Sequence, residues 1–286
     1  MKNKTTLIIL IIISLIVGRN LSFVPKFNLF SNDAKKIASL KKEVIDIIKK
    51  KKGNYGVYFS SLKSNKIFFG INENQIYTAA SLNKVPIVAT LYYMAGKGEI
   101  NLDEKITIQK EDIQDYGTGS LRYEKPGSVY SLKTLTKLSL QQSDNTAAYI
   151  IATKIGMDNI QKIINMWGLT ETSMSNNKTS LVDMFTLLKK IYDRKITNSS
   201  LTKELLDFLT NTDIEDRLPD LLPENTIVYH KTGDTIGGIH DVSIIQKGNN
   251  PFFLGVMTSD IVDRKETEQT IARIAKKVFD FETNRQ

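Results

Sequence analysis

The spacing of hydrophobic positions predicts a helix followed by a β-hairpin at the start of the chain's body. Residues 33–52 carry apolar side chains at helical intervals, and the segment is followed by Gly53, a residue type that commonly ends a helix. Residues 54–62 and 67–71 then alternate between apolar and polar positions around a short polar segment. This alternation is typical of two antiparallel strands joined by a turn.

The middle of the chain shows the helical period almost throughout. Residues 81–93 place Val85, Val88, Ala89 and Tyr92 on one face of a predicted helix. Further helices are predicted at 131–142, 146–155, 158–167, 179–193 and 200–210.

The period changes to that of strands near the C-terminus. Segments 226–231, 239–246 and 251–257 are rich in β-branched residues, and residues 267–281 return to the helical period. Strands at both ends with helices between them predict an α+β fold. We expect an antiparallel sheet of about five strands, flanked by the N- and C-terminal helices, with an inserted all-helical lobe.

The first 32 residues differ from this body and predict a signal or membrane-anchor segment with a linker. Lys2 and Lys4 precede an apolar run from Leu7 to Val17, which is short for a membrane span but matches the core of an export signal. Because no clear cleavage site follows, both secretion and tethering to the membrane remain open. The alternative is a buried N-terminal strand or helix.

The expected organisation is therefore an exported, extracytoplasmic domain over residues 33–286. Its α/β lobe would comprise residues 33–78 plus 212–286, and its helical lobe residues 79–211.

The positive charge is confined to the N-terminal region. The chain has 39 Lys and Arg against 31 Asp and Glu, but residues 1–52 hold 12 of the former and 3 of the latter. The remaining residues therefore carry 27 basic and 28 acidic groups, a balance of −1. This distribution excludes a basic nucleic-acid groove on the folded body and allows an N-terminal association with a membrane surface.

The absence of cysteine and the scarcity of histidine exclude several kinds of site. A chain with no Cys and only two His, His230 and His240, cannot use disulfides, thiol catalysis or thiolate zinc sites. We expect both histidines to have packing or surface roles and expect no metal or organic cofactor.

Three short motifs supply the candidate chemistry. Ser81 and Lys84 form a Ser-x-x-Lys motif at the start of a predicted helix, whereas the other four such motifs lack this context. Ser143-Asp144-Asn145 falls at a predicted helix–helix junction, and Lys231-Thr232-Gly233 ends a predicted strand. Taken singly, each is better explained as a helix cap or turn. Together and in this order, they predict a serine acyl-transfer site.

With these motifs the chain resembles the penicillin-recognising serine hydrolases, and among them it is most similar to class A β-lactamases. The resemblance covers residues 35–282. It implies that Ser81 is the nucleophile, Lys84 the base, and Ser143 the group that passes a proton to the leaving nitrogen. Because Lys84 lies three residues after Ser81 on a helix, both would point along the same face.

The resemblance also implies a set of substrate-binding groups. Lys231, Thr232 and Gly233 would bind the substrate carboxylate, and Asn145 a substrate amide. Tyr116 would wall the cleft, Asp144 would be structural, and the backbone N–H groups of Ser81 and Asp234 would form the oxyanion hole.

Two departures from the family pattern affect the expected chemistry. The segment between the second and third motifs is short, and no Glu occurs between Glu171 and Glu204. We therefore expect a truncated omega loop without the glutamate that activates the deacylating water, unless Asp183 faces the cleft. Asp234 replaces a small residue and would repel an anionic substrate unless it turned outward.

Three functions remain open on the sequence alone. The first is a β-lactamase-like hydrolase that forms an acyl-enzyme with small-molecule β-lactams and releases it slowly. The second is a D-Ala-D-Ala carboxypeptidase-like enzyme acting on D-Ala-terminated wall peptides. The third is a non-catalytic module that binds β-lactams or wall peptides.

Overall fold

The computed structural model describes residues 32–64 and 66–284. The chain divides into two compact units, residues 1–36 and 37–286. The sheet and the candidate site described for this protein belong to the second unit. The predicted signal segment lies outside the described residues, and the lobe boundaries stay predictions. No helix among residues 32–64 and 66–284 is long and apolar enough to cross a membrane.

A five-stranded antiparallel sheet forms the centre of this unit, with strand order β2-β1-β9-β8-β7. The pairing joins distant parts of the chain, because β1 lies between β2 and β9. The edge strand β7 pairs over its whole length with β8. The strands are β1 (Asn54–Ser61), β2 (Phe68–Ile71), β7 (Ile227–Thr235), β8 (Gly238–Gln246) and β9 (Phe252–Ser259).

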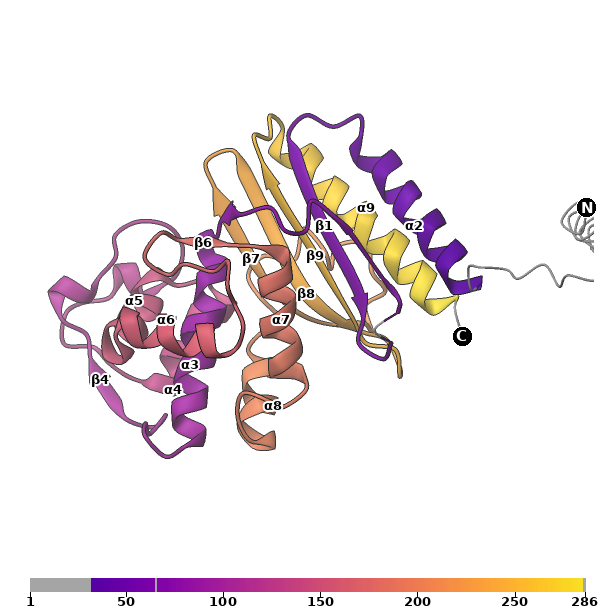
Figure 1. The fold of residues 1–286 in the computed structure, drawn as a ribbon. Helices are drawn as coiled ribbons and strands as arrows, with labels where there is room; N and C mark the ends of the chain where they lie inside the picture. Colours follow the sequence, from indigo (N-terminus) through magenta and orange to yellow (C-terminus); the bar gives the residue numbers. More distant parts are fainter. Residues whose placement is uncertain (1–31, 65, 285–286) are drawn as a thin grey trace, which may run out of the picture. The chain divides into compact units, whose positions relative to one another are not determined.

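Helices cover both faces of the sheet, so the central strands are apolar on both sides (Figure 1). Leu254 and Val256 of β9 pack in one cluster with α2 (Asn32–Ile48) and α9 (Arg264–Thr283). Phe253 of the same strand packs on the opposite face with α7 (Leu181–Tyr192). This double burial explains why β9 is a nearly continuous apolar run.

The helices between β3 and β6 pack around α3 together with α8, and α3 is buried along most of its length. Two small strand pairs, β3 with β6 and β4 with β5, were not predicted from the sequence. The elements of this region are β3 (Tyr77–Thr78), η2 (Ala80–Asn83), α3 (Lys84–Gly96), β4 (Lys105–Thr107), η3 (Lys110–Asp112), η4 (Leu121–Tyr123), β5 (Val129–Ser131), α4 (Leu132–Gln141), α5 (Asn145–Ile155), α6 (Met157–Met166), β6 (Lys178–Thr179) and α8 (Ser199–Asp207).

The structure confirms the predicted α+β class with its five-stranded antiparallel sheet, and it corrects several predicted boundaries. The N-terminal helix ends at Ile48 instead of Lys52. The helix predicted from Ser81 begins at Lys84, because a 3-10 turn precedes it. Strand β7 runs on to Thr235, so the Lys-Thr-Gly motif lies within the strand and not at its end.

Candidate active site

Ser81 lies on a tight turn that presents its hydroxyl to Lys84. The 3-10 turn η2 carries Ser81 and leads directly into α3, whose first residue is Lys84. Ala80, just before the serine, has a φ of 49°, a left-handed conformation that costs energy for a residue with a side chain. Lys84 Nζ lies 2.7 Å from Ser81 Oγ. The hydroxyl and the amine are therefore close enough to exchange a proton directly.

Burial makes the neutral amine of Lys84, the form that can accept a proton, more abundant near neutral pH than in an ordinary lysine. The residue is 4% exposed, and its amine also donates to Asn145 Oδ1 at 2.8 Å. Desolvation lowers the pKa of Lys84 to about 8, against the opposing influence of the Asp144 carboxylate. A neutral amine is thus available above about pH 8 instead of above the usual value of 10.5.

The Ser143-Asp144-Asn145 motif forms the junction between α4 and α5. Asp144 is fully buried and accepts hydrogen bonds from the backbone N–H groups of Ala147 (2.9 Å) and Leu121 (2.8 Å). It caps α5 and fixes a neighbouring turn, as expected of a structural residue. Ser143 has a φ of 56°, so this sharp turn directs its side chain differently from a helical residue.

Lys231 connects the third motif to the second. Its amine, on β7, donates to Ser143 Oγ at 3.0 Å, and the residue is 2% exposed. Burial, followed by the positive charge of Lys84, lowers the pKa of Lys231 to about 7. Because the Lys231 amine donates to Ser143 Oγ, the hydroxyl proton of Ser143 is free to be donated elsewhere.

Gly233 allows β7 to approach the turn that carries Ser81. A Cβ atom at this position would lie 3.1 Å from the carbonyl oxygen of Ala79 and 3.2 Å from Leu82 Cγ. Any side chain here would push the strand away from η2. The glycine of the motif therefore has a packing reason, which is the close contact between strand and turn.

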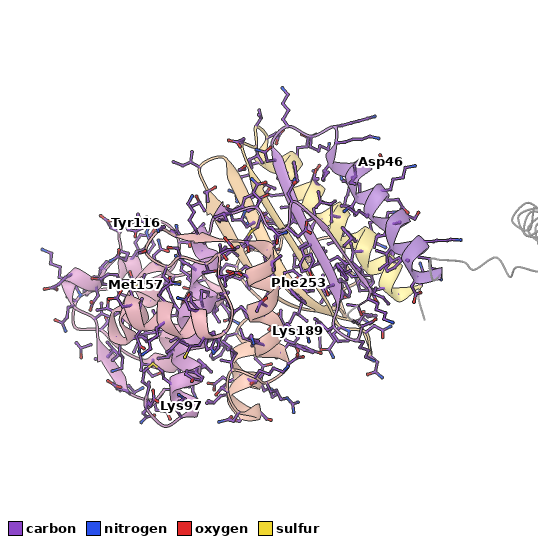
Figure 2. The ribbon with its side chains drawn as sticks, viewed as in Figure 1. Asp46, Lys97, Tyr116, Met157, Lys189 and Phe253 are labelled. Atoms are coloured by element: carbon purple, nitrogen blue, oxygen red, sulfur yellow. The ribbon has the colours of Figure 1, made fainter. Side chains whose placement is uncertain are left out.

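These residues surround one cavity of about 720 Å³. Six of the predicted site residues line it: Ser81, Lys84, Tyr116, Ser143, Asn145 and Asp234. Tyr116 and Met157, both labelled in Figure 2, belong to the part of the wall built by the helical region. Tyr116 is 64% exposed, and its backbone oxygen accepts a hydrogen bond from Asn145 Nδ2 at 3.0 Å.

Three predicted residues are not part of the lining among the described residues. Lys231 reaches the cavity wall through its contact with Ser143. Thr232 is 4% exposed, and Gly233 packs against the turn that carries Ser81. The structure therefore brings all three motifs together but leaves the expected contact of the Thr232 hydroxyl with substrate a prediction.

A family model described as the beta-lactamase enzyme family matches residues 39–281. This range includes most of the chain and all three motifs. The chain belongs to the beta-lactamase enzyme family. It is a β-lactamase-like serine hydrolase in fold and in family.

Its relatives in this family are distant but cover almost the whole chain. Beta-lactamase VEB-1 of Pseudomonas aeruginosa is 26% identical over 273 residues, covering 85% of this chain and 90% of its own length. Among solved structures, the TLA-1 extended-spectrum beta-lactamase superposes with a TM-score of 0.80 at 26% identity, covering 86% of this chain and 99% of its own.

PBP-A resembles the chain equally well. Its structure has a TM-score of 0.79 at 25% identity and covers 85% of this chain and 95% of its own. A point mutant of PBP-A, solved as an acyl-enzyme complex with penicillin G, has the same TM-score.

The carboxylates at the end of the segment between α6 and α7 are not part of the described cavity lining. Asp183 is 3% exposed and accepts hydrogen bonds from the Glu171 backbone (2.9 Å) and from Thr172 Oγ1 (2.7 Å). It fixes the loop to the start of α7 and is not part of the cavity lining. The only carboxylate among the described lining residues is Asp234.

An amide pair lies on the wall formed by this short segment. Asn177 lines the cavity and, with a φ of 51°, accepts a hydrogen bond through its side-chain oxygen from Asn83 Nδ2 at 3.2 Å. Its backbone oxygen also accepts a hydrogen bond from the N–H of Ala79 at 2.8 Å, next to the turn that carries Ser81. Neither asparagine was predicted as a site residue from the sequence, because Asn in a polar segment has no distinctive pattern.

Two arginines beside Asp234 were also missed. Arg217 is completely buried, and Arg264 begins α9 and lines the cavity. They are distant from Asp234 in the sequence, by 17 and 30 positions, and only the fold brings them together. Asp234 therefore faces the cleft without turning outward, but its charge is compensated by two cations.

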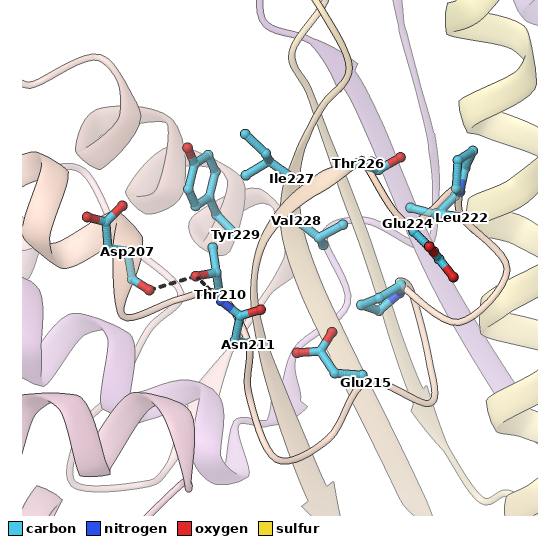
Figure 3. Close-up of a pocket in the computed structure, with 12 residues that line it drawn as sticks. Asp207, Thr210, Asn211, Glu215, Leu222, Glu224, Thr226, Ile227, Val228 and Tyr229 are labelled. Atoms are coloured by element: carbon cyan, nitrogen blue, oxygen red, sulfur yellow. Dashed lines mark hydrogen bonds between the residues drawn. The ribbon is translucent and has the colours of Figure 1, made fainter.

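A second cavity, of about 500 Å³, lies beside the start of β7 (Figure 3). It is lined by Glu215, Tyr229 and the loop that precedes the strand, and it contains none of the predicted site residues. Glu215 Oε1 lies 3.3 Å from Nε2 of His230, which is fully buried and within 3.0 Å of the Asp241 carboxylate. The structure thus places His230 in a buried ion-pair network.

This network predicts a pH-dependent contribution to stability. Burial opposes protonation, but Asp241 and Glu215 outweigh it and raise the pKa of His230 from 6.5 to about 9. The stabilisation is fully present below pH 6.5 and is lost as the pH rises through about 9. We expect His230→Gln to lower the free energy of unfolding by about 3 kcal/mol more at pH 6 than at pH 10, measured by urea denaturation.

His240→Gln is the matched control. His240 is also buried, but burial lowers its pKa, so it is neutral over most of this pH range. The loss of stability in this variant should not shrink as the pH rises. An equal loss for His230→Gln at both pH values would contradict the ion-pair interpretation.

Proposed function

We propose that Ser81 attacks the carbonyl carbon of a β-lactam and forms an acyl-enzyme. The Ser81 proton passes to the neutral amine of Lys84, 2.7 Å away, as the oxygen–carbon bond forms. The bond between the carbonyl carbon and the ring nitrogen then breaks. Ser143 donates its proton to that nitrogen and regains one through the neighbouring lysines.

The observation that carries this proposal is the pairing of two buried lysines with two serines around one cavity. Lys84 contacts Ser81, and Lys231 contacts Ser143. Burial lowers the pKa values of both amines toward neutrality. A lysine with only a structural role on the surface would keep its usual pKa, so this lowering is typical of a functional site. The β-lactam substrate class is supported by the names of the relatives and by the penicillin G complex of the PBP-A mutant.

We propose further that the acyl-enzyme is released slowly. Its hydrolysis requires a base that activates water, and the single carboxylate among the described lining residues is engaged by two arginines. The Asn177 amide can hold a water molecule but cannot take its proton. Loss of a well-placed general base costs about 10²–10⁴ in rate.

The same observation favours a second candidate, a penicillin-binding enzyme of the D-Ala-D-Ala carboxypeptidase type. Such an enzyme would acylate on D-Ala-terminated wall peptides, and β-lactams would trap it. Release of D-alanine from a D-Ala-D-Ala peptide would support this candidate. A non-catalytic module would bind either ligand without a covalent adduct.

The decisive experiment follows the reaction with a chromogenic cephalosporin and records the intact mass of the protein. We expect a burst of about one equivalent of colour, then slow turnover and a persistent adduct. Rapid turnover without an accumulated adduct would contradict slow release. Binding without any adduct would contradict acylation and favour the binding module.

We also propose export of the chain, with cleavage or tethering of its N-terminal segment. The support is the apolar run from Leu7 to Val17 behind two lysines, together with the chain's relationship to beta-lactamases. Fractionation of producing cells, with mass analysis of the mature N-terminus, tests this proposal.

A further inference from the structure

Arg217 is a buried cation, and Asp234 is the only residue of the described cavity lining that its guanidinium contacts. Its side chain is fully buried, and Nη1 donates to the backbone oxygens of His240 (2.8 Å) and Gly233 (3.3 Å). Nη2 donates to both carboxylate oxygens of Asp234, at 2.8 and 3.0 Å. Because two sheet strands hold the guanidinium, it cannot easily turn to another partner.

Arg264 reaches the same carboxylate from the start of α9. Its Nη1 lies 2.6 Å from Asp234 Oδ1, and its Nε lies 2.7 Å from Glu268 Oε1. The Arg264 side chain is 53% exposed and lines the cavity, whereas Glu268 is not among the described lining residues. Asp234 therefore lies between a buried arginine and an exposed one.

The carboxylate stays ionised in this position. Burial opposes ionisation, but Arg217 and Arg264 together lower the pKa of Asp234 below its usual value. The protein thus supplies an anion of its own where the cations of β7 and α9 meet the cavity. A substrate carboxylate entering there would have to compete with this internal anion for the same N–H donors.

We propose that Asp234 is a specificity-determining residue that occupies the arginine site which a substrate carboxylate would otherwise use, and so disfavours anionic substrates. This inference rests on the proposed acylation of Ser81. The site then reacts with neutral or weakly anionic acyl donors more readily than the positive charges of Arg217 and Arg264 alone would suggest. Two charges of one sign cannot share the arginines at low cost.

The test compares penicillin G with its methyl ester, which differs only in the charge of the carboxyl group. The second-order rate constants of acylation are measured by intact mass for the full chain. For each protein, the rate constant for penicillin G is divided by the rate constant for the ester. We expect Asp234→Ser to raise this ratio at least about tenfold, which corresponds to one charge-assisted hydrogen bond. A ratio that stays within about twofold of the wild-type ratio would overturn the inference.

Two further variants keep the result interpretable. Asp234→Asn retains an oxygen acceptor for buried Arg217 and removes only the charge, so it should fold and raise the ratio in the same direction. Glu268→Gln removes an equal charge from Arg264 at a carboxylate outside the cavity lining, and it should leave the ratio unchanged. If Glu268→Gln raised the ratio as much as Asp234→Ser, the effect would be explained by the overall charge near the cavity and not by competition between Asp234 and the substrate for the arginines.

The wild-type protein separates this inference from the proposed function. Adducts that form on Ser81 with an unchanged ratio in both Asp234 variants contradict only the role of Asp234. If neither the acid nor the ester forms an adduct, the proposed acylation is wrong, and the inference falls with it.

Discussion

Replacement of Ser81 by alanine is expected to abolish the covalent adduct with penicillin G. Lys84 contacts the Ser81 hydroxyl at 2.7 Å, and the side chain of alanine has no oxygen that could form the ester bond. We expect the acylation rate to fall by at least about 10³-fold, to the limit of detection. Intact mass spectrometry after incubation with penicillin G measures this directly.

Ser200→Ala is the matched control for the choice of nucleophile. Ser200 also begins a Ser-x-x-Lys motif, but it lies exposed on α8 and is not part of the cavity lining. This variant should form the adduct at the wild-type rate. An adduct that survives in Ser81→Ala, or that is mapped to Ser200, would be incompatible with the proposed nucleophile.

Replacement of Lys84 by methionine is expected to reduce acylation by about 10²–10⁴-fold while the protein remains folded. Methionine fills a similar buried volume without an amine, so the packing at the start of α3 should be preserved. The fall in the acylation rate would therefore reflect the loss of the proton acceptor and not a change in the fold. Stopped-flow acylation of the wild type and the variant, with the melting temperature as a check on folding, measures the effect.

The pH profile gives this prediction a second readout. Because the pKa of Lys84 is lowered to about 8, the neutral base becomes more abundant as the pH rises through 8, and wild-type acylation should increase there. Lys84→Met should lose this rise. In the variant, Lys231 loses the repulsion of the Lys84 charge, so its own pKa should move upward from about 7.

Lys137→Met provides the control, because Lys137 is an exposed lysine on α4 outside the cavity lining. It should change neither the acylation rate nor its pH profile. A wild-type profile that is flat between about pH 6 and 9 would argue against Lys84 as the base.

The periodicity of the sequence predicted the main elements because their burial is simple. Strand β9 packs on both faces and α9 on one, so each leaves a clear apolar pattern. The small pairs β3–β6 and β4–β5 were missed because strands of two or three residues are too short to show a period. The 3-10 turn at Ser81 was predicted to be α-helix because its residues also suit one.

The site divides in the same way between what was and was not predictable. The three motifs could be found because their chemistry depends on residue type and local spacing, as for Ser81 and Lys84. Arg217, Arg264 and Asn177 could not be found, because each lies in a segment without a distinctive pattern and acts only through contacts across the fold.

The sequence by itself predicted the nucleophile and its lysine, and it fixed the order of the three motifs and the lack of a glutamate between Glu171 and Glu204. Tertiary structure decided the surroundings of these groups: the burial that lowers the pKa values of Lys84 and Lys231, and the two arginines that hold Asp234. The physical reason is that residue type and order are local properties, whereas desolvation and charge pairing depend on which distant segments the folded chain brings within a few ångströms.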